Sequence, residues 1–130
     1  QSELHNLENV YFFGKIHKDQ IPAYLSNFDV CINPQKRNAI TLGNFPLKIV
    51  EYLAMGKPVV AVETNTMKET FGEVCYIAKD QNAFSQLLHK AIAEDSVEKR
   101  QTRIAFSRQF GWEKVAENVL SAIKEISKGN

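Results

Sequence analysis

Apolar and polar positions follow two patterns along this 130-residue chain. Runs of consecutive apolar residues, many of them β-branched, predict buried strands at 10–14, 30–34, 58–62 and 74–78. Apolar residues at helical spacing predict helices at about 20–27, 46–55, 82–93, 97–109 and 112–127. Helices that alternate with continuously apolar strands are typical of an α/β fold, here a Rossmann-like parallel sheet with helices on both faces.

The elements predicted after residue 62 are indicated by apolar spacing and by a single capping residue. The helix at 82–93 has Asn82 as its expected N-cap and an apolar face that consists of Phe84, Leu87, Leu88 and Ala91. Residues 63–73 join two strands and are short for a crossover, close to the minimum of about 10–12 residues. The last helix begins at Trp112 and continues the apolar spacing to Ile123.

Residues 46–62 hold the most informative pattern. Pro46 opens a short helix and Gly56 closes it, which is the favoured arrangement of helix ends. Lys48 and Glu51 are three residues apart, so they share one face near the first turn. Because a helix N-terminus offers free N–H groups and a positive dipole end, a lysine there makes a site for anionic phosphate. A carboxylate one turn further on can accept hydrogen bonds from a ribose.

This segment, with the sequence PLKIVEYLAMGKPVVA, resembles the donor-nucleotide motif of GT-B glycosyltransferases in its bacterial group 1 (family 4-like) form. Other segments follow in the order of that family. Residues 10–14 resemble the strand and glycine before the base-binding loop, and 24–30 resemble a helix that leads into the next strand. Residues 110–112 resemble the aromatic-tryptophan element near the C-terminus of the family. The likeness extends from roughly residue 7 to residue 123.

The resemblance implies roles for the two charged residues of the helix. Glu51 would bind the ribose hydroxyls of a nucleotide-sugar donor, and Lys48 would be the catalytic cation that neutralises the departing diphosphate. A competing interpretation makes Glu51 an ordinary helix glutamate paired with Lys48 or Lys57, which adds little to stability. For Lys48 the competing interpretation is a solvated surface lysine.

Backbone groups beside this helix complete the expected donor site. The amides of Leu47, Lys48 and, if Asn44 or Phe45 caps the helix, Phe45 would face the diphosphate. Gly43 stands where many relatives carry an additional glutamate that contacts the transferred sugar, so the sugar contact is in doubt. Gly43 either lets the backbone approach the diphosphate or is a simple turn glycine.

The loop after the first predicted strand has its own implied role. In the family this loop takes the nucleobase, and the resemblance assigns that role to Lys15 and Ile16. Lys36 and Arg37 follow the second strand in the same layer and are more typical of a solvated loop than of a phosphate site. His17 is interpreted as a solvent-exposed loop histidine.

By the family pattern, residues 1–130 are part of a C-terminal nucleotide-sugar-binding domain. Two further strands and a whole acceptor-binding domain would precede residue 1, and the missing strands would lie between strands 10–14 and 30–34. We expect the isolated fragment to be inactive. We also expect it to self-associate or to rearrange its strand order, because open strand edges invite pairing.

Composition narrows the class of partner. A net charge of +1 supplies no field for nucleic acid, and no apolar stretch approaches the roughly 20 residues needed to span a bilayer. Cys31 and Cys75 lie in apolar runs and are predicted to be reduced core thiols, and they form no metal-ligand pattern with His5 or His89. The basic residues between positions 98 and 103 are interpreted as a solvated helix face, with peripheral membrane contact as the alternative.

The sequence therefore predicts a donor-binding fragment of a glycosyltransferase, a transferase of polysaccharide biosynthesis located in the cytoplasm or peripheral to the inner membrane. It would use a UDP- or GDP-type nucleotide-sugar and pass a hexosyl group to a saccharide or lipid-linked acceptor, with no metal and no cofactor required by the design. One alternative is a GT-B nucleotide-sugar epimerase. Another is a non-enzymatic flavodoxin-like binding module, such as a receiver domain. A receiver needs a pair of acidic residues at its strand ends, and the predicted strand ends of this chain lack such a pair: they are Gly14-Lys15, Asn33-Pro34 and Glu63.

Overall fold

The computed structural model of the chain describes residues 3–34, 46–111, 120–121 and 123–126. These residues form a parallel sheet in the order β1-β2-β3, with β1 at Cys31–Asn33, β2 at Val59–Val62 and β3 at Tyr76–Ala78. Cys31 pairs with Val59, and Val60 pairs with Tyr76. The α/β class and the Rossmann-like parallel sheet predicted from the sequence are confirmed.

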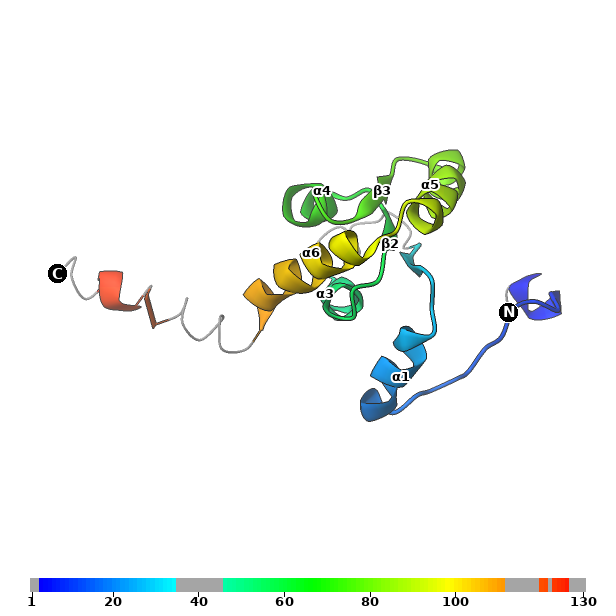
Figure 1. The fold of residues 1–130 in the computed structure, drawn as a ribbon, viewed down its shortest axis with the longest axis horizontal. Helices are drawn as coiled ribbons and strands as arrows, with labels where there is room; N and C mark the ends of the chain where they lie inside the picture. The colour runs from blue at the N-terminus through cyan, green and yellow to red at the C-terminus, as the bar shows by residue number, and fades with distance from the viewer. Residues whose placement is uncertain (1–2, 35–45, 112–119, 122, 127–130) are drawn as a thin grey trace.

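Helices cover both faces of this sheet. Figure 1 shows α5 (Gln81–Ala93) on one side of β2 and β3, with α3 (Leu47–Ala54), α4 (Asn65–Phe71) and α6 (Val97–Ser107) on the other. Shorter helices complete the described chain: α1 (Ile21–Ser26) and the 3-10 turns η1 (Glu3–Asn6), η2 (Lys18–Gln20) and η3 (Arg108–Phe110). Among the described residues, no helix is long and apolar enough to cross a membrane.

The main core lies between the sheet and the helices α3, α4 and α6. Alternate strand residues point to this side because side chains in a strand alternate between the two faces. The fully buried members are Ile49, Leu53, Val59, Ala61 and Phe71. Burying each large side chain contributes about 1.5–3 kcal/mol, so this cluster is the principal stabilising feature of the described fold.

The glycine that ends α3 has the conformation predicted for it. Gly56 has φ +73°, in the left-handed region that favours glycine. Its N–H donates to the Leu53 carbonyl at 2.9 Å, and the N–H of Lys57 donates to the Tyr52 carbonyl at 3.1 Å. These two bonds are those of a Schellman motif, and they satisfy carbonyl groups that the helix end would otherwise leave open.

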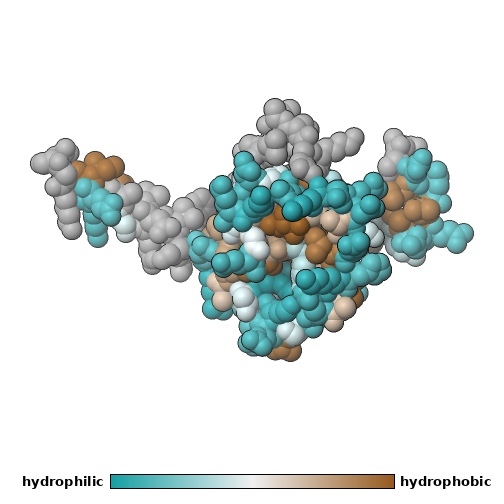
Figure 2. All heavy atoms as spheres, turned by 90° about the horizontal axis from the view of Figure 1, so that it is seen from above, coloured by the Kyte–Doolittle hydropathy of each residue, from teal (hydrophilic) through white to brown (hydrophobic). Residues whose placement is uncertain are grey.

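The strand predicted at 10–14 is wrong. These residues are described and form no strand, and the side chains of Tyr11, Phe12 and Phe13 are exposed, Tyr11 by 75%. Their composition favours a strand, but a strand needs a partner, and none of the three described strands pairs with this segment. Phe12 instead stacks on His5 with ring centroids 4.0 Å apart, and Phe13 packs edge-on against Tyr24 at 5.2 Å. Figure 2 shows apolar side chains on the surface of this N-terminal part.

One helix was not predicted, and the start of another differs from the prediction. Residues 63–73 contain the helix α4, whose N-cap Thr64 accepts a hydrogen bond from the Met67 amide at 3.1 Å. The cap of α5 is Asp80, which accepts from the Ala83 amide at 2.8 Å, so Asn82 lies inside the helix and is not the cap. In both cases a short oxygen-bearing side chain satisfies a free amide of the first turn.

The C-terminal prediction is covered only in part. The described residues of the predicted helix 112–127 are helical at 120–121 and 123–126, and the remaining ones, with Trp112, lie outside the described residues. The predicted helix 97–109 corresponds to α6 followed by η3.

The described sheet leaves β1 at one edge, and self-association through that edge stays a prediction.

Candidate functional site

The position of α3 follows from the order of the strands. Because β1 and β2 are parallel neighbours, the chain must return from the carboxyl end of β1 to the amino end of β2, and α3 makes this return. The first turn of α3 therefore lies at the carboxyl edge of the sheet and Gly56 lies at the amino edge. Ligands of open α/β sheets collect at the carboxyl edge.

The first turn of α3 has free backbone donors. Its N-cap is Pro46, which forms no side-chain capping bond, and the Ile49 amide donates to the Pro46 carbonyl at 3.0 Å. The amides of Leu47 and Lys48 precede that bond and have no acceptor among the described residues. The Phe45 amide was assigned to the site only if Asn44 or Phe45 caps the helix, and this condition is not met because Pro46 is the N-cap. Gly43, Asn44 and Phe45 themselves lie outside the described residues.

The two charged residues of α3 face away from the core. Ile49 and Leu53 are fully buried, whereas Lys48 and Glu51 are exposed. Neither Lys48 nor Glu51 forms a side-chain hydrogen bond or an ion pair with any residue that the structure describes. Lys57, the other proposed partner of Glu51, donates instead to the Ser26 carbonyl at 3.2 Å. The charges of Lys48 and Glu51 are therefore available to a ligand at this edge.

Other groups at the carboxyl edge are partly committed to the fold. Glu63 follows β2, its amide donates to the Ala78 carbonyl at 2.9 Å, and its carboxylate lies 3.5 Å from the Lys68 ammonium. Thr64 caps α4. Lys36 and Arg37, in the segment after β1, lie outside the described residues. Asp80, which follows β3, caps α5. Lys48 and Glu51, in contrast, have no side-chain hydrogen bond or ion pair with the described residues.

The proposed base-binding residues lie elsewhere. Gly14 makes a turn with φ +70°, after which Lys15 is exposed and Ile16 is half-buried. The segment before α1 is well separated from α3 in Figure 1. The structure therefore does not bring Lys15 and Ile16 together with Lys48 and Glu51, and their role in binding a nucleobase stays a prediction.

Two cavities lined by described residues are at the amino edge. One of about 330 Å³ is lined by polar residues that precede β1 and β2, among them Asp29 and Lys57, together with Asp95 and Arg100. The other, of about 200 Å³, includes Cys75 and Tyr76 at the start of β3 and Thr102 of α6. Neither contains a predicted donor-site residue. At the carboxyl edge, residues 35–45 lie between β1 and α3 in the sequence and outside the described residues.

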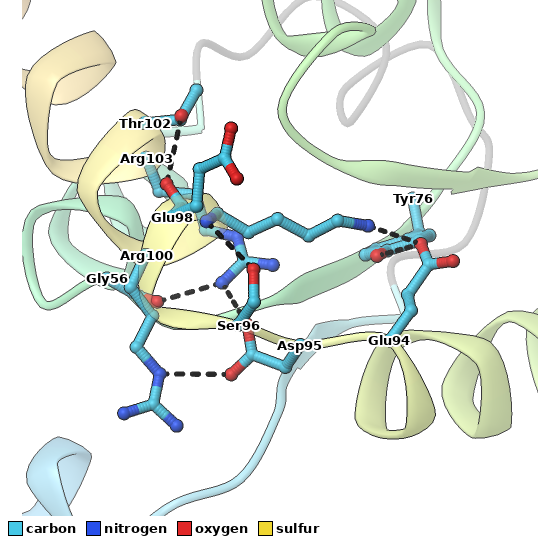
Figure 3. Close-up of polar contacts among 10 residues, drawn as sticks. Gly56, Tyr76, Glu94, Asp95, Ser96, Glu98, Arg100, Thr102 and Arg103 are labelled. Carbon is cyan, nitrogen blue, oxygen red and sulfur yellow. Dashed lines mark hydrogen bonds and ion pairs between the residues drawn. The ribbon is translucent and has the colours of Figure 1, made fainter.

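A buried ion pair at the amino edge was not predicted (Figure 3). Arg103 is only 3% exposed, and its Nη1 donates to the Gly56 carbonyl at 3.0 Å and to Asp95 Oδ1 at 2.7 Å. Arg100 Nε donates to Asp95 Oδ2 at 3.1 Å. Partial burial acts to raise the pKa of Asp95, but hydrogen bonds from Arg103 and Arg100 outweigh it and hold this pKa below its ordinary value.

The interpretation of residues 98–103 as a solvated basic face needs correction. Arg103 is buried, Arg100 pairs with Asp95, and the Lys99 ammonium lies 3.0 Å from Glu94. Glu94 also accepts a hydrogen bond from the Tyr76 hydroxyl. Arg103 precedes Phe106 by three residues and Phe110 by seven, a spacing that puts the three side chains on one face of a helix. This spacing is the sequence signal that could have indicated the buried position of Arg103.

The cysteine prediction is confirmed among the described residues. Cys31 and Cys75 are free and buried. Burial raises the pKa of Cys31 to about 11 and that of Cys75 to about 12, so both are neutral thiols near pH 7. Within the described ranges, no group of three or more His, Cys, Asp or Glu side chains could hold a metal ion.

Comparison with known proteins adds a family to this geometry. A family model described as "Glycosyl transferases group 1" matches residues 1–94, a span that contains β1, α3, β2 and β3. The chain is 41% identical over 58 residues to a protein of Bacillus subtilis (strain 168) named "Putative teichuronic acid biosynthesis glycosyltransferase TuaH". That alignment covers 45% of this chain and only 15% of the length of the relative. No solved structure matches the chain significantly.

Proposed function

Since the chain belongs to the group 1 glycosyl transferases, we propose that the first turn of α3 binds the diphosphate of a nucleotide-sugar donor. On this proposal residues 1–130 are part of the C-terminal donor-binding domain of a GT-B enzyme. The observation that carries the proposal is the first turn itself. It presents two amides without described acceptors, and the side chains of Lys48 and Glu51 without described partners, at the edge where such folds bind ligands.

The charges suit the chemistry of glycosyl transfer. When the sugar leaves the donor, negative charge grows on the diphosphate oxygens, and a fixed cation together with helix-end amides stabilises it. Lys48 is the cation, and Leu47 and Lys48 supply the amides. Glu51, one turn further along the same face, accepts hydrogen bonds from the ribose hydroxyls, which are stronger than bonds between neutral groups because the acceptor is charged.

The remaining donor contacts belong to the same proposal. Gly43, Asn44 and Phe45 immediately precede Pro46 in the sequence and would extend the diphosphate site, with Gly43 in the place of the sugar-contacting glutamate of other relatives. Lys15 and Ile16 would contact the nucleobase once their loop approaches α3. The donor is of UDP or GDP type.

The wider reaction is proposed from the relatives. A hexosyl group would pass to a saccharide or lipid-linked acceptor during polysaccharide biosynthesis, on the cytoplasmic side of the inner membrane. The name of the Bacillus relative refers to teichuronic acid biosynthesis, which supports a role in polysaccharide biosynthesis. The family match also favours a transferase over a receiver-like binding module.

Calorimetric titration of the full-length protein with UDP, GDP and ADP tests the donor site. We expect one of these nucleoside diphosphates to bind, and we expect Lys48→Ala and Glu51→Ala to weaken its binding by roughly 5- to 150-fold, equivalent to ~1–3 kcal/mol. Lys90→Ala and Glu98→Gln are matched controls, because they remove the same charges from exposed positions on α5 and α6. Both controls should bind like the wild type. Absence of binding by the folded wild type, or equal losses in controls and site variants, would contradict the proposal.

A further inference from the structure

The C-terminal end of α3 is held by a side chain from another helix. Arg103 reaches from α6 to the Gly56 carbonyl, 47 residues earlier in the chain, at 3.0 Å. Gly56 lies one residue beyond the cap of α3, where carbonyl groups carry the negative end of the helix dipole. A buried guanidinium at this point therefore binds the end of α3 both by a hydrogen bond and by its charge.

The guanidinium is itself fixed in place. Its Nη1 also donates to Asp95 Oδ1 at 2.7 Å, and Asp95 immediately precedes Ser96, the N-cap of α6. Arg103 therefore links three points: its own helix, the turn between α5 and α6, and the end of α3 (Figure 3). A side chain that is 3% exposed and bonded at two acceptors has almost no freedom to shift.

The same end of α3 also packs tightly against α6. A Cβ atom added to Gly56 would lie 3.3 Å from Ile104 Cδ1, slightly closer than ordinary contact, and 3.4 Å from Arg100 Cβ, at the lower limit of ordinary contact. The absence of a side chain at Gly56 thus lets the two helices approach until the Arg103 bond can form. α6 therefore contacts the end of α3 in two ways, by packing against Gly56 and by the hydrogen bond from Arg103.

We propose that Arg103 is a positioning residue for the donor site at the opposite end of α3, an inference that rests on the proposed function. The helix has eight residues and is about 12 Å long, so it moves as one rigid piece. Any shift of Gly56 then displaces Lys48 and Glu51 by a similar amount. A displacement of about 1 Å would take Lys48 and Glu51 out of good hydrogen-bonding geometry with the donor, and hydrogen bonds weaken steeply when they are misaligned, so the anchor at Gly56 governs donor binding from the other edge of the sheet.

Arg100 supplies a matched control. Like Arg103, it donates one hydrogen bond to Asp95, but its side chain is 59% exposed, and Asp95 is the acceptor of its one side-chain hydrogen bond in the described structure. Arg100→Met removes a guanidinium from Asp95 and keeps the Cβ that packs near Gly56. Arg103→Met also removes a guanidinium from Asp95 and in addition releases the Gly56 carbonyl. A difference between these variants therefore reports on the anchor and not on the loss of charge.

The test measures nucleoside diphosphate binding by the full-length protein, at a temperature where circular dichroism shows each variant to be folded. We expect Arg103→Met to weaken binding by roughly 5- to 50-fold, within the range expected for the loss of one donor contact, Arg103→Lys to weaken it less, and Arg100→Met to change it by less than about threefold. In steady-state assays Arg103→Met should raise KM for the donor and leave KM for the acceptor unchanged, a selectivity that general destabilisation does not produce.

Wild-type affinity in a folded Arg103→Met variant would overturn the inference, as would an equal loss in Arg100→Met. If Arg103→Met does not fold, Arg103→Lys decides, because it keeps the charge but loses the planar group that reaches both acceptors. Its binding at the wild-type level would then overturn the inference. Failure of the wild type to bind any nucleoside diphosphate is a different result, since it contradicts the proposed function itself.

Discussion

Replacing Phe71 by alanine should lower the free energy of unfolding by about 3–5 kcal/mol. Phe71 ends α4, is 0% exposed, and has ring centroids 6.0 Å from Phe106 and 5.7 Å from Phe110. These rings connect α4 to α6 and η3. The substitution removes a large apolar side chain from water-free surroundings and leaves a cavity, and each lost aromatic contact adds about 0.5–1.5 kcal/mol.

Urea denaturation followed by circular dichroism measures this loss. Phe12→Ala is the matched control, since it deletes the same side chain from a position that is 55% exposed. We expect the control to lower stability by no more than about 1.5 kcal/mol, because it loses its stacking on His5 but leaves no cavity in the core. Equal effects of the two substitutions would show that Phe71 does not lie in the core as described.

Replacing Asp95 by asparagine should also destabilise the fold by about 3–5 kcal/mol. The Arg103 guanidinium is nearly fully buried, and Asp95 is the carboxylate that neutralises it at 2.7 Å. Asparagine keeps the shape of the side chain but leaves a positive charge in the interior without a counter-charge. Removing one partner of a buried ion pair is strongly destabilising for this reason, even where the intact pair adds little to stability.

The double variant Asp95→Asn, Arg103→Met separates this cause from a loss of packing. It removes both charges and should recover a large part of the lost stability in urea denaturation, whereas a double variant no more stable than Asp95→Asn would contradict the account. The pH dependence gives an independent check. Because the folded-state pKa of Asp95 is lowered, its contribution is complete above the unfolded-state pKa and is lost as pH falls below roughly 4. Asp95→Asn should lack this part of the acid-induced loss.

The sheet and the helix α3 could be predicted because their signals are local. The apolar run at 59–62 and the glycine at position 56 dictate a buried strand and a helix end whatever lies around them. Residues 10–14 show where this reasoning fails. Their composition favours a strand, but no described strand pairs with them, so Tyr11, Phe12 and Phe13 remain exposed. The helix α4 was missed because only Met67 and Phe71 mark its buried side, and its clearest signal is the cap at Thr64.

For the candidate site, the sequence predicted the placement of two charged side chains, and their role in donor binding stays a prediction. Spacing alone placed Lys48 and Glu51 on one face, and strand order then put that face at the carboxyl edge. The buried position of Arg103 was not predicted, because charged residues on a helix usually face water and the acceptor at Gly56 is distant in sequence. Whether Lys15 and Ile16 join the site depends on the position of a loop, which sequence pattern does not determine.

Amide hydrogen exchange of the full-length protein tests the donor-site proposal most directly. Peptides that span residues 46–50 should exchange more slowly when a nucleoside diphosphate is bound, because the free amides of Leu47 and Lys48 then donate to phosphate oxygens. The corresponding nucleoside without phosphates should not produce this protection at the same concentration. If the diphosphate binds but exchange at residues 46–50 is unchanged, and protection appears instead around the amino-edge cavities near Lys57 or Thr102, the first turn of α3 is not the donor site.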